Sequence, residues 1–243
     1  MNEVESIANL IGQRLAYILK GNYHGVSANW LNKNCDLIYA STYDFLSSGM
    51  VFPNFELSDL EEGEFVFEQT ISQKSGVNFG ASYDCEIGLA SFLYAYILQT
   101  KPIVVVETGV ANGITTNVIL SALKKVGGVL HSFDIDPRTE GVHPASPSWN
   151  FHLLEGNVSR TLKDEVAKIG KIDLWIHDSN HGYRWQNFEY RLALQALSIG
   201  GLLVSDDIDS STAWGLLESR QKMMKCGIFD NRKMYGVAQL SQK

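Results

Sequence analysis

The chain has 243 residues, which is enough for one large domain or for one domain with a smaller lobe. Hydrophobic residues make up 45% of it and charged residues 19%, as is typical of a globular protein with a sizeable core. The formal net charge is -7 and no run of lysine or arginine occurs. This charge argues against nucleic acid as a partner, because nucleic-acid-binding proteins usually carry a basic face.

Membrane insertion and secretion are not expected from the sequence either. The longest apolar stretch, Ile87 to Leu98, is too short to span a bilayer and reads as a buried helix. The first residues include Glu3 and Glu5 and lack the basic segment of a secretory signal. Three widely spaced cysteines without a CxxC motif predict free thiols rather than disulfides. We therefore expect a cytoplasmic protein with a small-molecule substrate and no membrane partner, and a homo-oligomer is compatible with the sequence.

The chain divides into two regions of different texture. Residues 1–82 begin with an amphipathic pattern between Val4 and Leu19, where apolar residues recur every three or four positions. After Gly21, segments rich in Asn, Ser, Asp and Gly alternate with aromatic residues. We predict a helical and irregular N-terminal cap over residues 1–82 and a second domain over residues 83–243.

The second region predicts a doubly wound α/β domain. Apolar runs of strand length alternate with helical patterns, which implies a mostly parallel sheet with right-handed crossovers. A closing antiparallel pair is expected between Gly227 and Leu240, which gives a Rossmann-like, seven-stranded sheet. The five parallel strands are predicted at residues 103–106, 129–133, 151–154, 172–176 and 202–205. Ligands of such sheets bind at the carboxyl ends of the strands, so the loops there are the candidate site.

The loop after the first of these strands reads Glu107-Thr-Gly-Val-Ala-Asn-Gly113. Glycine in a strand-to-helix turn lets a ligand approach the backbone and places it at a helix N-terminus. The spacing differs from the dinucleotide fingerprint G-x-G-x-x-G. A tight turn without any ligand is the alternative interpretation of this loop.

The second predicted strand ends in Phe133-Asp134-Ile-Asp136. A carboxylate at this position can accept hydrogen bonds from the two hydroxyls of a ribose. Asp134 is the candidate, whereas Asp136 precedes a proline and fits a turn better. This geometry serves nicotinamide dinucleotides and S-adenosylmethionine alike, so it does not separate the two cofactors.

Three carboxylates follow two neighbouring predicted strands. The fourth strand is followed by His177-Asp178-Ser-Asn-His181, and the fifth ends in Ser205-Asp206-Asp207. Buried carboxylates repel one another, and a divalent cation such as Mg²⁺ removes that cost. His181, three residues after Asp178, is a candidate general base. Helix caps and solvated loop charges are the alternative for each acid taken singly.

These motifs together resemble the class I S-adenosylmethionine-dependent methyltransferases. The likeness runs from about Tyr83 to Leu240 and is nearest to the small bacterial family of metal-dependent sugar and antibiotic O-methyltransferases. It rests on the acidic glycine loop, on the Asp-x-x-His spacing from Asp178 to His181, and on the paired acids Asp206-Asp207 after a Gly-Gly turn. The sequence departs from the family pattern in having Ala111 as the middle residue of the glycine motif. Ser-Asn also replaces the usual Gly-Asp between Asp178 and His181.

The resemblance implies a function and a set of site residues. The function is transfer of a methyl group from S-adenosylmethionine to a hydroxyl of a sugar, natural product or aromatic compound. By this resemblance, Asp178, Asp206 and Asp207 would hold Mg²⁺, and His181 would deprotonate the acceptor. Residues expected at the cofactor are Glu107, Gly109, Ala111, Gly113, Asp134, Asn157, Val158 and His177.

Two other functions stay open at this level. An NAD(P)-dependent oxidoreductase would also fit a Rossmann-like sheet, but the glycine spacing and the lack of a Tyr-x-x-x-Lys motif disfavour it. A methyltransferase-like protein that only binds a partner is the other alternative, which the retained acids and His181 oppose. The acceptor itself is not identified, and Tyr183 and Trp185 could line its pocket or belong to the core.

Overall fold

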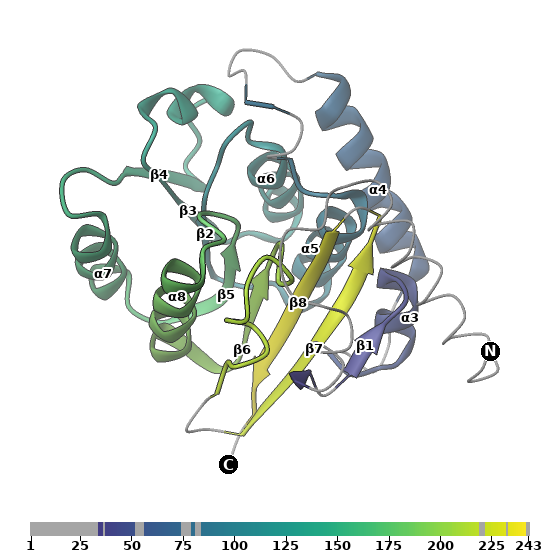
Figure 1. Cartoon of the computed structure of the whole chain (residues 1–243). Coiled ribbons are helices and arrows are strands. Elements are labelled where there is room, and N and C mark those ends of the chain that lie inside the picture. Colours follow the sequence, from purple (N-terminus) through teal and green to yellow (C-terminus); the bar gives the residue numbers. More distant parts are fainter. Residues whose placement is uncertain are drawn as a thin grey trace.

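A computed structural model of the chain describes residues 34–35, 37–51, 56–73, 79–80, 84–218, 222–231 and 233–241. The amphipathic pattern between Val4 and Leu19 lies outside these residues. The described part forms one central sheet with helices on both faces (Figure 1). The predicted doubly wound α/β fold is confirmed.

Within the described residues the sheet has eight strands, one more than the sequence predicted. They are β1 (Leu37–Tyr39), β2 (Val104–Thr108), β3 (Val129–Asp134), β4 (Trp149–Leu153), β5 (Ile172–His177), β6 (Leu197–Ser205), β7 (Met223–Asp230) and β8 (Lys233–Leu240).

The order of the strands across the sheet is β1-β7-β8-β6-β5-β2-β3-β4. All neighbours are parallel except β8, which runs antiparallel to both β6 and β7. The additional strand, β1, comes from the predicted cap and pairs with β7 at the edge of the sheet. The domain boundary at residue 82 stays a prediction.

Helices cover both faces because the central strands are apolar on both sides. In β2, Val105 points into the cluster under α5 and α6, whereas its neighbour Val106 points into the cluster under α7 and α8. The helices are α3 (Thr42–Ser47), α4 (Leu57–Ser72), α5 (Ile87–Thr100), α6 (Ile114–Val126), α7 (Val158–Ile169) and α8 (Tyr183–Ala196), and a 3₁₀ helix, η2, spans Pro137–Val142.

The apolar stretch from Ile87 to Leu98 is the buried helix α5, as the sequence indicated. It lies between the sheet and α4, and the two helices pack closely. A side chain on Gly63 of α4 would come within 2.8 Å of the Ser91 Cα. No helix in the described ranges combines the length and apolarity needed to cross a membrane.

The register of the strands aligns the loops that carry the predicted site residues. Thr108, the last residue of β2, pairs with Phe133 of β3 on one side and with His177 of β5 on the other. His177 in turn pairs with Ser205 of β6. The chain therefore leaves β2, β3, β5 and β6 at nearly the same level, and the residues after these strands meet at one edge of the sheet.

Candidate active site

A pocket of about 500 Å³, the strand-end pocket, opens beside the carboxyl ends of β2, β3 and β5. Five residues predicted from the sequence line it, namely Gly109, Ala111, Asp134, Val158 and Asp178. The remaining lining residues are Phe79, Thr108, Phe133, Ile135, Asp136, Leu154, Ser179, Asn180, Trp185 and Glu189.

The glycine loop between β2 and α6 has a left-handed backbone at three positions. Gly109 has φ +89°, Ala111 +46° and Gly113 +74°. A side chain on Gly109 would lie 2.0 Å from the carbonyl oxygen of Asp178, so this glycine allows the loop to pack on the β5–α8 loop. The sequence suggested that glycine here lets a ligand approach the backbone. In the structure, a side chain at this position would first collide with the backbone of Asp178 in the same chain.

Gly113 does not line the strand-end pocket. It precedes α6 as its N-cap, and a side chain on it would collide with Val142 at 2.5 Å. Its role in the described structure is therefore to let the chain enter the helix next to η2. A direct cofactor contact of Gly113 remains a prediction without geometric support.

Asp134 lies at the end of β3 and lines the strand-end pocket. Its Oδ2 accepts hydrogen bonds from the backbone N–H groups of Val110 at 2.8 Å and Ala111 at 3.2 Å. Its Oδ1 accepts one from the N–H of Asp136 at 2.9 Å. Of the roughly four acceptor sites of a carboxylate, only one, on Oδ1, is left open by these bonds. Asp134 thus fixes the glycine loop and keeps capacity for one hydroxyl of a ribose.

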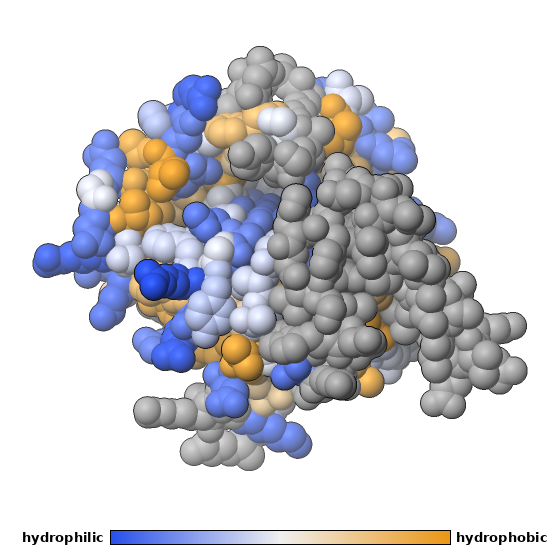
Figure 2. All heavy atoms as spheres, viewed as in Figure 1, coloured by the Kyte–Doolittle hydropathy of each residue, from blue (hydrophilic) through white to orange (hydrophobic). Residues whose placement is uncertain are grey.

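The far wall of the strand-end pocket is apolar. Ile135 follows Asp134 and is 67% exposed, and Leu154 and Val158 lie on the same pocket lining. Figure 2 shows apolar surface gathered in the region of β4. Exposed apolar side chains next to a carboxylate suit a flat base joined to a ribose. Asn157, which was expected at the cofactor, is the exposed N-cap of α7, and its side chain accepts from the Arg160 N–H.

Glu107 is fully buried beneath the glycine loop and does not line the strand-end pocket. Its Oε2 accepts hydrogen bonds from Thr116 of α6 and Ser132 of β3, both at 2.7 Å. Burial raises the pKa of Glu107 to about 7, although these two hydroxyls act to lower it. The carboxyl group therefore joins β2, β3 and α6, which differs from the cofactor contact predicted for it.

His177 is also fully buried, so it does not line the strand-end pocket as the sequence suggested. Its Nδ1 contacts Oε2 of Glu189, a buried residue of α8. Glu189 also accepts from Thr108 Oγ1 at 2.6 Å and from Ser179 Oγ at 2.9 Å. This network holds the loop after β5 in place. Glu189 was missed in the sequence analysis. It could have been noticed only as a carboxylate on the side of α8 that faces the core.

Of the two aromatic residues considered for the acceptor, Trp185 lines the strand-end pocket and Tyr183 is exposed at the start of α8. The indole Nε1 of Trp185 donates to Ser179 Oγ at 2.9 Å.

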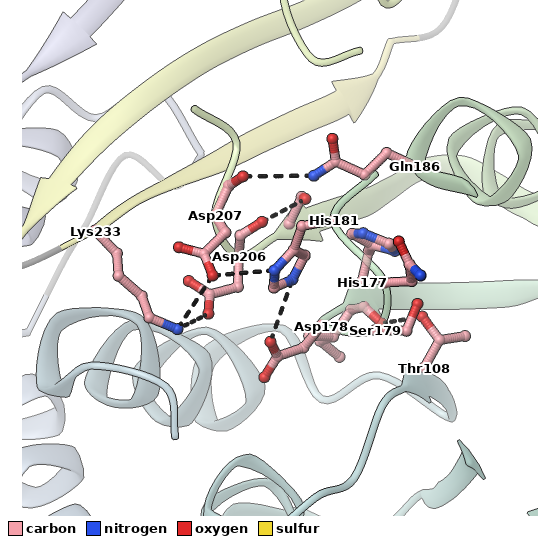
Figure 3. A network of polar contacts seen from close by, with 12 residues as sticks. Thr108, His177, Asp178, Ser179, His181, Gln186, Asp206, Asp207 and Lys233 are labelled. Carbon is pink, nitrogen blue, oxygen red and sulfur yellow. Dashed lines mark hydrogen bonds and ion pairs between the residues drawn. The ribbon is translucent and has the colours of Figure 1, made fainter. Parts of the chain in front are cut away.

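The three aspartates predicted as metal ligands, hereafter the acid cluster, do converge (Figure 3). His181 lies among them: its Nδ1 is 3.0 Å from Asp207 Oδ2 and its Nε2 is 3.7 Å from Asp178 Oδ1. The side chain of Lys233, at the start of β8, also extends to the acid cluster. Its Nζ is 2.8 Å from Asp206 Oδ2 and 3.3 Å from Asp207 Oδ2.

Charge and burial set the protonation of the acid cluster. Burial, with help from Asp206, raises the pKa of Asp178 well above its ordinary value. Burial acts in the same direction on Asp207, but the hydrogen bond from His181 and the charge of Lys233 outweigh it, so its pKa is lowered. Burial would lower the pKa of His181, and the contact with Asp207 raises it instead. The cluster therefore combines one carboxyl group that retains a proton easily with a carboxylate–imidazole pair.

The acid cluster does not fit Mg²⁺ as it stands. Magnesium requires oxygen ligands at about 2.0–2.1 Å in near-octahedral geometry. The Oδ2 atoms of Asp206 and Asp207 already contact the Lys233 ammonium group. Within the described ranges, no three His, Cys, Asp or Glu residues are disposed to hold a metal ion. The magnesium ion thus stays a prediction from the sequence that this geometry does not favour.

Comparisons with known proteins agree with the fold. Residues 106–208 match the family model of a methyltransferase domain. An SAH-bound methyltransferase from Podospora anserina is 16% identical with a TM-score of 0.53, covering 83% of this chain and 95% of its own. A candidate O-methyltransferase from Klebsiella pneumoniae is 13% identical with a TM-score of 0.50, covering 76% and 90%. At these identities the likeness concerns the fold. Among curated proteins, no sequence matches.

The strand order, the glycine loop and the acidic end of β3 define the class I methyltransferase fold. Residues 106–208, which follow the sheet from β2 to the end of β6, are similar to a methyltransferase domain. The alternative of an NAD(P)-dependent oxidoreductase finds no support in this match.

Proposed function

We propose that this protein transfers a methyl group from S-adenosylmethionine to a hydroxyl oxygen of a small molecule. One observation carries the proposal: Asp178 lines the strand-end pocket and also faces His181, which lies among the aspartates of the acid cluster. A cofactor pocket and a group able to take up a proton therefore share one residue. Methyl transfer to a hydroxyl requires this adjacency, because the oxygen must lose its proton as it attacks.

The strand-end pocket offers what S-adenosylmethionine needs. Asp134 Oδ1 would accept from a ribose hydroxyl, and Ile135 and Val158 would cover the adenine. The backbone of Gly109 and Ala111 would lie along the methionine part of the cofactor. When bound, the cofactor would supply a methyl group on a sulfonium: the acceptor oxygen would bond to the methyl carbon as the carbon–sulfur bond breaks, and S-adenosylhomocysteine would leave.

The residues of this chain would then handle the acceptor. His181 directs Nδ1 to Asp207, and its Nε2 has no hydrogen-bond partner among the described residues. In the tautomer that these contacts favour, Nδ1 carries the hydrogen and Nε2 can take the hydroxyl proton. An acceptor oxygen held beside Asp178 would be within reach of Nε2. No step of this mechanism passes through a metal ion.

Calorimetric titration with S-adenosylhomocysteine tests the cofactor part of the proposal, with NADH as the competing ligand. Methyl transfer is tested with radiolabelled S-adenosylmethionine and a panel of sugar, phenolic and polyketide hydroxyl compounds. We expect Asp178→Asn to lower methyl transfer by at least about tenfold while S-adenosylhomocysteine still binds, because the amide cannot take up or release a proton beside His181.

Asp173→Asn is the matched control. Asp173 lies in the same strand, β5, and its carboxylate accepts from the backbone N–H groups of Ile103 and Val104 at the opposite end of the sheet. Its replacement should leave both binding and methyl transfer unchanged in folded protein. Binding of NADH but not of S-adenosylhomocysteine would reject the proposed function.

A further inference from the structure

The most unusual group at the acid cluster is a buried lysine. Lys233 is 8% exposed and begins β8, 27 residues after Asp206. Its side chain extends from the hairpin edge toward the aspartates, as Figure 3 shows. Burying an ammonium group is costly unless carboxylates pair with it. Here two do, at 2.8 Å and 3.3 Å.

The Lys233 ammonium group lies where a metal ion bound by Asp206 and Asp207 would have to lie. It contacts one oxygen of Asp206 and one of Asp207, and Asp178 also lies within electrostatic reach of it. A divalent ion that used the same two oxygens would have to displace the ammonium group. Lys233 thus supplies the positive charge that the three acids require in order to lie together.

Lys233 also acts on the proposed base through a carboxylate. Asp207 Oδ2 contacts both Lys233 Nζ and His181 Nδ1. The left-handed backbone of Asp207, with φ +46°, is uncommon for a residue other than glycine and holds this carboxylate between the two nitrogens. Lys233 is therefore a positioning residue: it fixes Asp207, which orients the imidazole ring of His181.

We propose that the ammonium group of Lys233 replaces a divalent metal ion as the resident cation of the acid cluster. This inference deepens the proposed function and rests on it. Methyl transfer at this site would then proceed without Mg²⁺. His181 would take the proton of the acceptor oxygen, while Lys233 holds Asp207 and Asp207 orients His181.

Binding of Mn²⁺, measured by electron paramagnetic resonance with and without S-adenosylhomocysteine, tests the inference without any acceptor. The wild-type protein should show no saturable Mn²⁺ site. Lys233→Ala removes the ammonium group and leaves three aspartates facing one another, so it should bind Mn²⁺ at least about tenfold more tightly. Adding Asp206→Asn to that variant should abolish the new site.

A second buried lysine provides the matched control. Lys225 lies in the neighbouring strand β7 and is 7% exposed, and its Nζ donates to the backbone carbonyls of Trp214, Gly215 and Leu217. Lys225→Ala removes an equally buried ammonium group and should create no Mn²⁺ site. Lys233→Gln, nearer in size to lysine, replaces Lys233→Ala if that variant does not fold.

Two results would overturn the inference. One is a single Mn²⁺ site in the wild-type protein that Asp206→Asn removes, since the acids would then hold a metal beside the lysine. The other is the absence of Mn²⁺ binding in the folded Lys233 variants, since the lysine would then occupy no cation site. The same samples report on the proposed function separately, because failure to bind S-adenosylhomocysteine would reject the cofactor pocket whatever Mn²⁺ does.

Discussion

Replacing Gly109 with alanine should disturb both the stability of the fold and the cofactor pocket. The built Cβ atom lies 2.0 Å from the Asp178 carbonyl oxygen, and real Cβ contacts essentially never fall below 3.0 Å. The β2–α6 and β5–α8 loops must therefore separate by about 1 Å. We expect a backbone cost of about 1–3 kcal/mol from the positive φ. Overpacking should add about 1–3 kcal/mol to the loss in free energy of unfolding.

Gly127→Ala separates these two costs. Gly127 has the same φ of +89°, but nothing lies within 4 Å of its built Cβ atom. This variant should carry only the backbone cost, and its affinity for S-adenosylhomocysteine should equal that of the wild type. Gly109→Ala should lose at least about tenfold in affinity, since the glycine loop and Asp178 both line the strand-end pocket.

Denaturant unfolding and calorimetric titration of the two variants make the comparison. A loss of stability in Gly109→Ala equal to that in Gly127→Ala, together with normal cofactor affinity, would refute the reasoning. It would show that the two loops do not pack as closely as the geometry of Gly109 requires.

Three further outcomes are expected. Asp134→Ala should weaken S-adenosylhomocysteine binding by about 1.5–3 kcal/mol, the range for hydrogen bonds to a charged group, and unchanged calorimetric affinity would remove Asp134 from the site. His181→Ala should lower the turnover number by roughly 10²–10⁴-fold with little change in cofactor affinity, and near-normal turnover in the radiolabel assay would exclude it as the base. For Glu107, the folded-state pKa of about 7 lies above the ordinary value of 4.5, so its contribution to stability is full below pH 4.5 and is lost as the pH rises through 7. Denaturant unfolding from pH 4.5 to 8.5 should show this decline in the wild type and a smaller one in Glu107→Gln; equal slopes would mean that Glu107 does not titrate differently on folding.

The fold class, and the edge of the sheet at which the candidate site lies, could be predicted from the sequence alone. Runs such as Ile103 to Val106, apolar on both faces, suit central parallel strands, and their alternation with helical patterns leaves few topologies. The loop positions of Gly109, Asp134 and Asp178 then follow from strand order, because parallel strands end at one edge of the sheet. All three line the strand-end pocket.

Other residues were assigned to the cofactor because sequence position does not reveal the direction of a side chain. Glu107 and His177 stand next to lining residues along their strands, yet alternation turns both away from the strand-end pocket into buried hydrogen-bond networks. Asn157 is one residue from Val158 and caps a helix instead. A shift of one residue along a strand or a helix start decides between these roles.

Only the tertiary structure brought Lys233 to the acid cluster. A sequence motif consists of residues that are near one another in the chain. Lys233 is distant in sequence and contacts Asp206 and Asp207 because β8 pairs with β6 in antiparallel orientation. The local pattern of acids indicated that a cation was required, since buried carboxylates repel one another. Which cation meets that requirement depends on a contact between distant segments, and such contacts are formed by the fold as a whole.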